Sequence, residues 1–183
     1  MPEIETARLI LRPFNLADFT DYHHQLTSDV EVMRNLLPGK ALSQEEAELF
    51  FNRFFEHWKR HQFGVWILRD KEDKELIGQC GLRWCYEYSP EIEMVYAIAK
   101  SHWGKGIASE AALASIKYGF EQLKPNKIMA IAAPTNLSSQ RVMQKVGLKY
   151  DKNVHYYGKD CVYYTISRQE WQPDDSLYIL QQT

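Results

Sequence analysis

The segment from residue 91 to residue 111 constrains the fold more than any other part of the chain. It begins with an apolar strand at Ile92–Ala99, continues through a loop with glycines at positions 104 and 106, and ends in an alanine-rich helix from Gly106 to about Leu123. A strand that leads through such a loop into a helix directs backbone N–H groups and the positive end of the helix dipole toward one point. Glycine suits both loop positions, because a Cβ would hold the backbone away from an anion or require an unfavourable dihedral angle. The pattern predicts a phosphate-binding loop in a protein that mixes strands and helices.

Hydrophobic periodicity places further strands and helices on both sides of this segment. Asn15 is an N-cap candidate for a helix to about Thr27, and a capping box from Ser43 to Glu46 opens a long amphipathic helix that ends near His61. A short helix at Leu137–Val146 is ended by Gly147. The remaining periodic runs are expected strands, at Thr6–Arg12, Phe63–Arg69, Leu76–Trp84, Lys127–Ala133, Leu148–Val154 and Cys161–Ser167. Short connections between residues 63 and 99 indicate an antiparallel meander, and the last two strands indicate a closing hairpin.

The length and charge of the chain exclude several classes of protein. The 183 residues are interpreted as a single domain over residues 1–183. The 22 basic and 24 acidic side chains give a net charge of −2, which argues against a general nucleic-acid-binding protein. No apolar run reaches the ~18–20 residues of a membrane span, and the N-terminus lacks the pattern of a signal peptide, so we expect a cytoplasmic protein that binds no membrane. Cys80, Cys85 and Cys161 form no C-x-x-C pair and are expected to be buried free thiols.

Three kinds of phosphate site compete for the glycine loop. A Walker A loop requires G-x-x-x-x-G-K-[ST], but here Lys105 lies between the two glycines and no Ser or Thr follows it directly. A dinucleotide-binding loop matches only in part, because Ser109 stands at the third glycine position and the strand that ends at Ala133 supplies no acidic residue for a ribose. The third alternative is a loop that binds the pyrophosphate of an acyl-CoA.

The third alternative is supported by a resemblance to a known family. The segment Trp103-Gly104-Lys105-Gly106-Ile107-Ala108-Ser109-Glu110-Ala111 is similar to the acetyl-CoA loop of the GNAT N-acetyltransferase superfamily, in its RimJ/RimL-like branch. Further blocks of this branch follow in the family's order, at Glu5–Arg12, Leu76–Leu82, Glu93 and the Asn-x-x-Ser segment Asn136–Leu148. One position departs from the pattern, since Ser101 stands where the superfamily usually has Gln or Arg. The blocks cover almost the whole chain.

The resemblance implies an α/β (α+β) fold: a single GNAT domain with a central mixed, mostly antiparallel sheet that is flanked by helices and splayed between its fourth and fifth strands. The pantetheine arm of acetyl-CoA would enter this split and hydrogen-bond the backbone at Ile98, and Asn136 and Ser139 would lie near the thioester. The other implied cofactor-binding residues belong to the pyrophosphate loop, and they are Trp103, Gly104, Lys105, Gly106, Ile107 and Ala108. Acetyl-CoA would be the acetyl donor, and no metal is implied.

Two residues are candidates for the chemistry of acetyl transfer to an amine. An ammonium group must lose a proton before it can attack a thioester, and the leaving thiolate benefits from a hydrogen-bond donor. Strand alternation puts Glu91 and Glu93 on the face opposite Ile92 and Met94, and alternation alone favours a solvated face for both glutamates. The resemblance instead favours Glu93 as the general base, acting through water. Ser139 is the candidate donor to the sulfur, and helix capping next to Asn136 is the alternative role.

The acceptor is the least defined part of the prediction. The RimJ/RimL resemblance implies a protein N-terminal α-amine, such as that of a ribosomal protein, while a small amine or amino acid stays open. The segment 26–61 and the closing hairpin would select the acceptor. A CoA-binding sensor or interaction module without catalysis is the alternative function, and homodimers are common in the superfamily. His57 and His61 lie at i, i+4 but have no third ligand, so a solvated helix end is expected there and no metal site.

Overall fold

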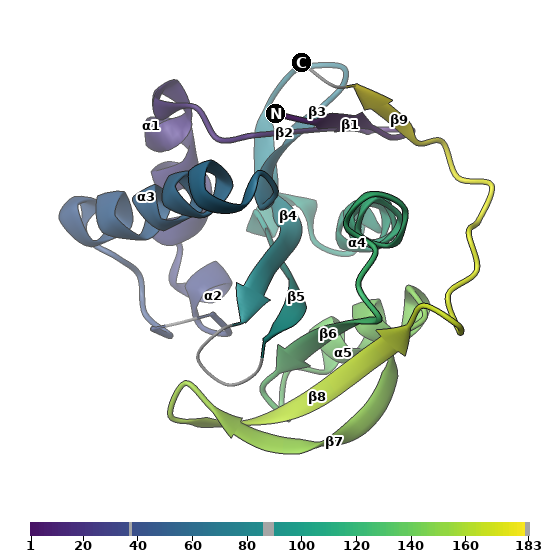
Figure 1. Cartoon of the computed structure of the whole chain (residues 1–183). Coiled ribbons are helices and arrows are strands. Elements are labelled where there is room, and N and C mark those ends of the chain that lie inside the picture. Colours follow the sequence, from purple (N-terminus) through teal and green to yellow (C-terminus); the bar gives the residue numbers. More distant parts are fainter. Residues whose placement is uncertain (37, 86–89, 182–183) are drawn as a thin grey trace.

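The computed structural model describes residues 1–36, 38–85 and 90–181. The strands join in one sheet with the order β7-β8-β6-β5-β4-β3-β2-β1-β9, so segments from both ends of the chain lie side by side at one edge (Figure 1). The strands are β1 (Glu3–Glu5), β2 (Leu9–Arg12), β3 (Val65–Asp70), β4 (Leu76–Cys85), β5 (Glu91–Ile98), β6 (Lys127–Ala132), β7 (Lys149–Tyr156), β8 (Lys159–Ser167) and β9 (Ile179–Gln181). The pairs are antiparallel except for β5 with β6, which confirms the predicted mixed, mostly antiparallel sheet.

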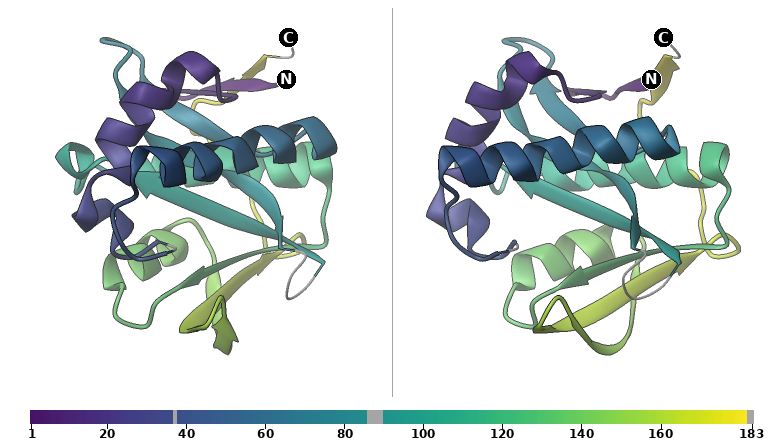
Figure 2. Two further views of the ribbon diagram at one scale, coloured as in Figure 1. Left: turned by 90° about the vertical axis from the view of Figure 1, so that its left-hand side faces the viewer. Right: turned by 60° about the vertical axis from the view of Figure 1, so that its left-hand side comes forward.

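Helices cover both faces of the sheet. The α-helices are α1 (Phe19–Tyr22), α2 (Val30–Met33), α3 (Gln44–His61), α4 (Ile107–Tyr118) and α5 (Leu137–Lys145). Helices α1 to α3 lie on one face, and α4 lies on the other face together with α5, which it contacts (Figures 1 and 2). One apolar cluster fills the space between the sheet and α4 and includes Ile92, Met94 and Ala111. A second cluster fills the space under α1 and α3 and includes Tyr22, Phe51 and Ile67.

The short elements at the N-terminus differ from the predicted pattern. The expected strand Thr6–Arg12 begins only at Leu9, because the Thr6 amide donates to the Leu9 carbonyl and closes a turn between β1 and β2. The expected helix from Asn15 is a 3-10 turn at Leu16–Asp18, then α1, then a π-helical turn at His23–Thr27. The Asn15 cap is as predicted, and its capping box is completed by Asp18.

The sheet divides at the parallel pair. Strand β5 pairs with β4 along its whole length, and β6 likewise pairs with β8, but β5 and β6 are in register only at Ile92 with Ile128 and at Glu93 with Met129. Beyond Glu93 the two strands diverge (Figure 1). This confirms the predicted splay, because the fourth and fifth strands expected from the sequence, Ile92–Ala99 and Lys127–Ala133, are β5 and β6.

Two further expectations concern burial and membranes. Cys80, Cys85 and Cys161 are buried free thiols, as predicted. Within the described ranges, no helix is both long and apolar enough to cross a bilayer.

Candidate active site

The free edge of β5 faces the split in the sheet. The Ala99 amide donates to the Ile77 carbonyl of β4, so strand alternation turns the N–H and C=O of Ile98 to the opposite side, toward the split. The Ile98 carbonyl accepts a 2.7 Å hydrogen bond from the indole Nε1 of Trp103. Trp103 thus anchors the following loop to the end of β5, and the Ile98 N–H is directed to where an extended ligand arm could pair with the strand.

The glycine loop presents an uncapped helix end. Gly104 and Gly106 have φ values of +75° and +77°, a conformation that side-chain-bearing residues avoid, which explains the glycines. Gly106 is the N-cap residue of α4 and offers no side chain to the amides of the first turn. These amides have no intrahelical acceptor, and Ile107, which is buried, holds the turn against the core. Exposed donors at a helix N-terminus suit an anion such as a pyrophosphate.

Hydrogen bonds from the turn between β1 and β2 hold this loop in place. The Glu110 carboxylate accepts from the Thr6 hydroxyl at 2.6 Å and from the backbone amide and Nε of Arg8 at 2.9 and 2.7 Å. Nη1 of Arg8 also donates to the carbonyl of Lys105 at 2.8 Å. The bonds to Thr6 and Arg8 hold the pKa of Glu110 below its usual value, even though burial alone would raise it. Glu110, predicted only as a first-turn acid, therefore fixes the loop to β1 and β2.

Glu93 is buried beside an arginine. Only 3% of the residue is exposed, so the expectation of a solvated strand face is wrong for Glu93. Arg83 stands opposite it in the β4–β5 register, and Nε and Nη2 of Arg83 lie 2.9 and 2.8 Å from Oε2 of Glu93. Glu91, on the same face, accepts from the Tyr163 hydroxyl at 2.6 Å and forms an ion pair with Lys127. Neither glutamate lies on a solvated face, because the hairpin β7–β8 and its aromatic side chains pack beside them.

Tyr157 completes the surroundings of this ion pair. Its hydroxyl lies 3.4 Å from Nη2 of Arg83 and 3.6 Å from Sγ of Cys85, and the Arg83 guanidinium lies 5.8 Å from its ring centre. Burial, and then the charge of Glu93, raise the pKa of Tyr157. A neutral phenol and a guanidinium therefore adjoin the Glu93 carboxylate near the point where β5 and β6 begin to diverge.

Ser139 and Asn136 lie on the other side of the split, at the start of α5. Asn136 is the N-cap, since its Oδ1 accepts from the Ser139 amide at 3.1 Å and from the Ser138 hydroxyl at 2.9 Å. The Ser139 hydroxyl takes no part in this cap and instead lies 2.7 Å from the hydroxyl of Tyr96 on β5. The hydroxyl of Ser139 is thus available for a role other than capping.

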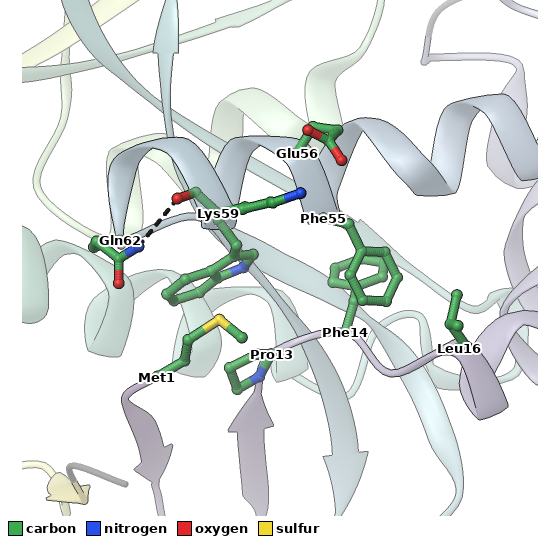
Figure 3. Close-up of a pocket in the computed structure, with 9 residues that line it drawn as sticks. Met1, Pro13, Phe14, Leu16, Phe55, Glu56, Lys59 and Gln62 are labelled. Atoms are coloured by element: carbon green, nitrogen blue, oxygen red, sulfur yellow. Dashed lines mark hydrogen bonds between the residues drawn. The ribbon is translucent and has the colours of Figure 1, made fainter.

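Other candidate residues have structural roles. Nδ1 of His57 lies 2.9 Å from the Phe63 carbonyl, and Nε2 accepts from the Trp84 amide at 3.1 Å, so His57 is not part of a solvated helix end. Among the described residues no cluster of three or more His, Cys, Asp or Glu side chains could hold a metal ion. A groove of about 510 Å³ under α3 is lined by Phe14, Phe55, Trp58 and neighbours (Figure 3). Part of its lining belongs to the segment 26–61 that is predicted to select the acceptor, but none of its lining residues is a predicted catalytic or cofactor-binding residue.

Arg8, Arg83 and Tyr96 contribute to this site, although the sequence did not predict a role for them. Arg83 could have been found from the meander, because a hairpin register that aligns β4 with β5 puts it opposite Glu93. Tyr96 carries a polar tip on an otherwise apolar strand face, which is a weaker signal. The contact of Arg8 spans about a hundred residues and leaves no periodic trace.

This chain is similar in sequence and in structure to known acetyltransferases. The acetyltransferase (GNAT) domain model matches residues 8–149. The uncharacterized N-acetyltransferase YnaD of Bacillus subtilis (strain 168) is 32% identical over 180 residues, covering 92% of this chain and 98% of YnaD. A solved acetyltransferase (GNAT family) from Bacillus anthracis is 27% identical with a TM-score of 0.77, covering 92% of this chain and 99% of that one. The fold also matches that of RimL, a ribosomal alpha-N-protein acetyltransferase solved with coenzyme A, at a TM-score of 0.73 and 14% identity, covering 88% and 95% of the two chains.

Proposed function

Because this chain belongs to the GNAT acetyltransferase family, we propose that it transfers the acetyl group of acetyl-CoA to a primary amine by direct attack. One observation carries the proposal: the uncapped N-terminus of α4 adjoins the open edge of β5, and a buried carboxylate and a serine hydroxyl lie on the two sides of the split. We treat residues 1–183 as one catalytic domain. The pairing of β1 with β9 supports this, since it joins both ends of the chain to the same sheet.

The residues along the split suit acetyl-CoA as the donor. The loop from Trp103 to Ala108 would hold the pyrophosphate through its amides from Gly104 onward, because the Trp103 amide already donates to the Lys100 carbonyl at 3.2 Å. The Lys105 side chain, which is exposed, would add positive charge. Ile98 would pair with the pantetheine arm through its backbone, and Asn136 would contact the arm near the thioester. When bound, acetyl-CoA supplies the activated acetyl group.

Glu93 and Ser139 take the two proton-handling roles in this proposal. Glu93 accepts the proton of the acceptor ammonium through water, which frees the nitrogen lone pair to attack the thioester carbonyl carbon. As the carbon–sulfur bond breaks, its electron pair goes to sulfur, and Ser139 donates a hydrogen bond to the thiolate. The nitrogen then loses its second proton, and the sulfur finally takes up one proton.

We propose a protein N-terminal α-amine as the acceptor, in line with the RimJ/RimL-like branch. The sequence blocks of that branch support this choice, while the likeness to RimL itself is one of fold. Lys159, at the start of β8, lies near Gly39 in the connection to α3, so these two segments border a common acceptor region. A small amine or an amino acid is the alternative acceptor, and a homodimer is the proposed assembly.

The ion pair itself favours a second candidate function. The Arg83 side chain neutralises Glu93, and a carboxylate held this way also serves as a purely structural pair. A CoA-binding sensor or interaction module would keep the loop and this pair without turnover.

The experiment that separates these functions combines binding with turnover. The purified chain is titrated calorimetrically with acetyl-CoA, CoA and NADP, and thiol release is followed over a panel of amines and N-terminal peptides. Acetyl-CoA binding with acceptor-dependent thiol release supports the enzyme. CoA binding without turnover supports the sensor, and no CoA binding removes both.

Glu93→Gln tests the base directly. We expect kcat to fall about 100-fold or more, a typical loss for a general base, with CoA affinity preserved because the loop is unchanged. Glu91→Gln is the matched control, since Glu91 lies on the same strand face but pairs with Tyr163 and Lys127. Undiminished turnover in Glu93→Gln would remove Glu93 from the mechanism.

A further inference from the structure

A tyrosine that the proposed mechanism does not use links the two sides of the split. Tyr96 lies on β5, three residues beyond the last position at which β5 and β6 are in register. Its hydroxyl lies 2.7 Å from Oγ of Ser139, where either oxygen can donate, and 3.0 Å from the Ser139 carbonyl oxygen, which can only accept. Tyr96 is thus the strand residue that reaches α5 where α5 presents its candidate donor.

Packing alone does not require the Tyr96 hydroxyl. Met94 and Ile98, its neighbours on the same strand face, belong to the apolar cluster under α4, and the Tyr96 ring packs against that cluster. A phenylalanine would fill the same volume, so the hydroxyl is explained only by its partner. Both hydrogen-bond contacts of the Tyr96 hydroxyl go to one residue, Ser139, whose amide is already held by Asn136.

The direction of the hydrogen bond decides what Ser139 can do. A serine hydroxyl has one proton, and that proton reaches an external acceptor only when the neighbouring group donates to Oγ. Burial raises the pKa of Tyr96, so its hydroxyl stays protonated over the neutral range. Its single proton can go to the Ser139 carbonyl or to Oγ, and the contact to Oγ is the shorter of the two, at 2.7 Å against 3.0 Å. A hydroxyl that accepts one hydrogen bond also donates a stronger one.

From this geometry we propose that Tyr96 is a positioning residue for acetyl transfer: its hydroxyl donates to Oγ of Ser139 and directs the Ser139 proton toward the leaving sulfur. This inference rests on the proposed function. Tyr96 exchanges no proton with the substrates. The attacking nitrogen forms its bond to the acetyl carbon, the carbon–sulfur electron pair goes to sulfur, and the Ser139 hydrogen bond stabilises the charge that develops there.

The test is a double-mutant cycle between Tyr96→Phe and Ser139→Ala, with kcat, KM for acetyl-CoA, the Kd of CoA and the melting temperature measured for each variant. We expect Tyr96→Phe to lower kcat about tenfold and to leave KM and the CoA Kd within about twofold, because the bond matters mainly as charge develops on sulfur. Ser139→Ala is expected to lose about 100-fold in kcat. The double variant should be no slower than Ser139→Ala alone, since both changes remove the same interaction.

Tyr164→Phe is the matched control. The Tyr164 hydroxyl also contacts α5, 3.3 Å from side-chain atoms of Gln140 and Gln144, but it does not touch Ser139. Its kcat should stay within about twofold of the unsubstituted protein.

The outcomes distinguish the two proposals. If the unsubstituted protein releases no thiol with any acceptor, the proposed function fails, and this inference fails with it. If the unsubstituted protein is active but Tyr96→Phe keeps its kcat, or its loss adds fully to that of Ser139→Ala, only the role of Tyr96 is overturned. An equal loss in Tyr164→Phe would show a general disturbance of α5 and would also overturn it.

Discussion

At the scale of single residues, an ion pair near the split joins the buried carboxylate of Glu93 to the guanidinium of Arg83. Glu93 is nearly fully buried, and the charge that offsets it comes from Arg83, whose side chain is 35% exposed. Burying a carboxylate without a partner is costly, and the guanidinium of Arg83 offsets that cost and fixes the position of Glu93. The two donor atoms of Arg83 converge on one oxygen of Glu93, Oε2. Arg83 therefore fixes the carboxylate that the proposed mechanism uses as its base.

Arg83→Met is predicted to damage both stability and activity. It leaves the Glu93 carboxylate buried without its cation, so we expect the free energy of unfolding to fall by about 2 kcal/mol, less than for a fully buried pair because Arg83 is partly exposed. Activity should fall with it, and Arg83→Lys should recover part of both. Urea unfolding and kcat/KM are the measurements.

Lys127→Met is the control for this prediction. It removes the partner of Glu91 in the neighbouring ion pair, but Lys127 is 43% exposed, so the loss should stay below about 1 kcal/mol. Equal effects of Arg83→Met and Lys127→Met would contradict a special role for Arg83.

For single residues, the sequence predicted which positions matter better than it predicted which side chains those residues contact. Gly104 and Gly106 could be identified because a positive φ selects a residue type that is visible in the sequence. The burial of Glu93 could not be predicted, because strand alternation indicates which face of the sheet a residue lies on but not what covers that face. The hairpin β7–β8, more than fifty residues later, covers it.

At the scale of elements, helix α3 is fixed to the sheet by a neutral histidine. Nδ1 of His57 faces the Phe63 carbonyl, which can only accept, and Nε2 faces the Trp84 amide, which can only donate. These partners require one proton on Nδ1 and none on Nε2. Burial, then the charges of His61 and Arg83, lower the pKa of His57 to about 4. A protonated His57 would lose the bond to β4.

The stability of the protein should therefore fall with pH in a defined window. The folded pKa of His57, about 4, lies below the unfolded value of 6.5. The contribution of His57 to the free energy of unfolding is therefore complete above pH 6.5 and is lost as the pH falls from 6.5 to 4, because in this window the unfolded chain binds the proton more strongly than the folded chain does. We expect a loss of about 1 to 2 kcal/mol, reduced from the full shift because the ring is partly exposed. His57→Gln should be less stable at pH 7 and show a flatter profile from pH 6.5 to 4, measured by urea unfolding. An unchanged slope in this variant would assign the pH dependence to other groups.

The length of an element decided whether the sequence predicted it. Helices α3 and α4 have enough turns for a periodic apolar stripe, and the α3 capping box at Ser43 and Glu46 is as predicted. Strands β1 and β9 have three residues each, and no local pattern marks them, because β1 is held between β2 and β9, and β9 pairs with β1. Helix α2 is a single turn held by the Asp29 side chain, which caps Glu31 and Val32. Such elements depend on contacts that periodicity cannot report.

At the scale of the whole molecule, the sheet consists of two parts with a narrow junction. Strands β1 to β5 with β9 form one part, β6 to β8 form the other, and the β5–β6 register joins them over two residue pairs. Helices α4 and α5 contact each other across the same split, and the Tyr96–Ser139 contact crosses it. A ligand arm that paired with β5 inside the split would add contacts to both parts at once. Binding should then stabilise the molecule as a unit.

Acetyl-CoA is predicted to raise the melting temperature and to slow hydrogen exchange at a specific place. At 100 times its Kd, a ligand that binds only the folded state adds about 2.7 kcal/mol. The amide of Ile98, which faces the split, and the amides of the first turn of α4 should become protected, while β2 and β3 should show only the global gain. Hydrogen exchange with and without CoA measures this. Thermal stabilisation without slower hydrogen exchange at the Ile98 amide would place the ligand outside the split. Slower exchange confined to Phe14, Phe55 and Trp58 would point to the groove under α3, because those residues line it.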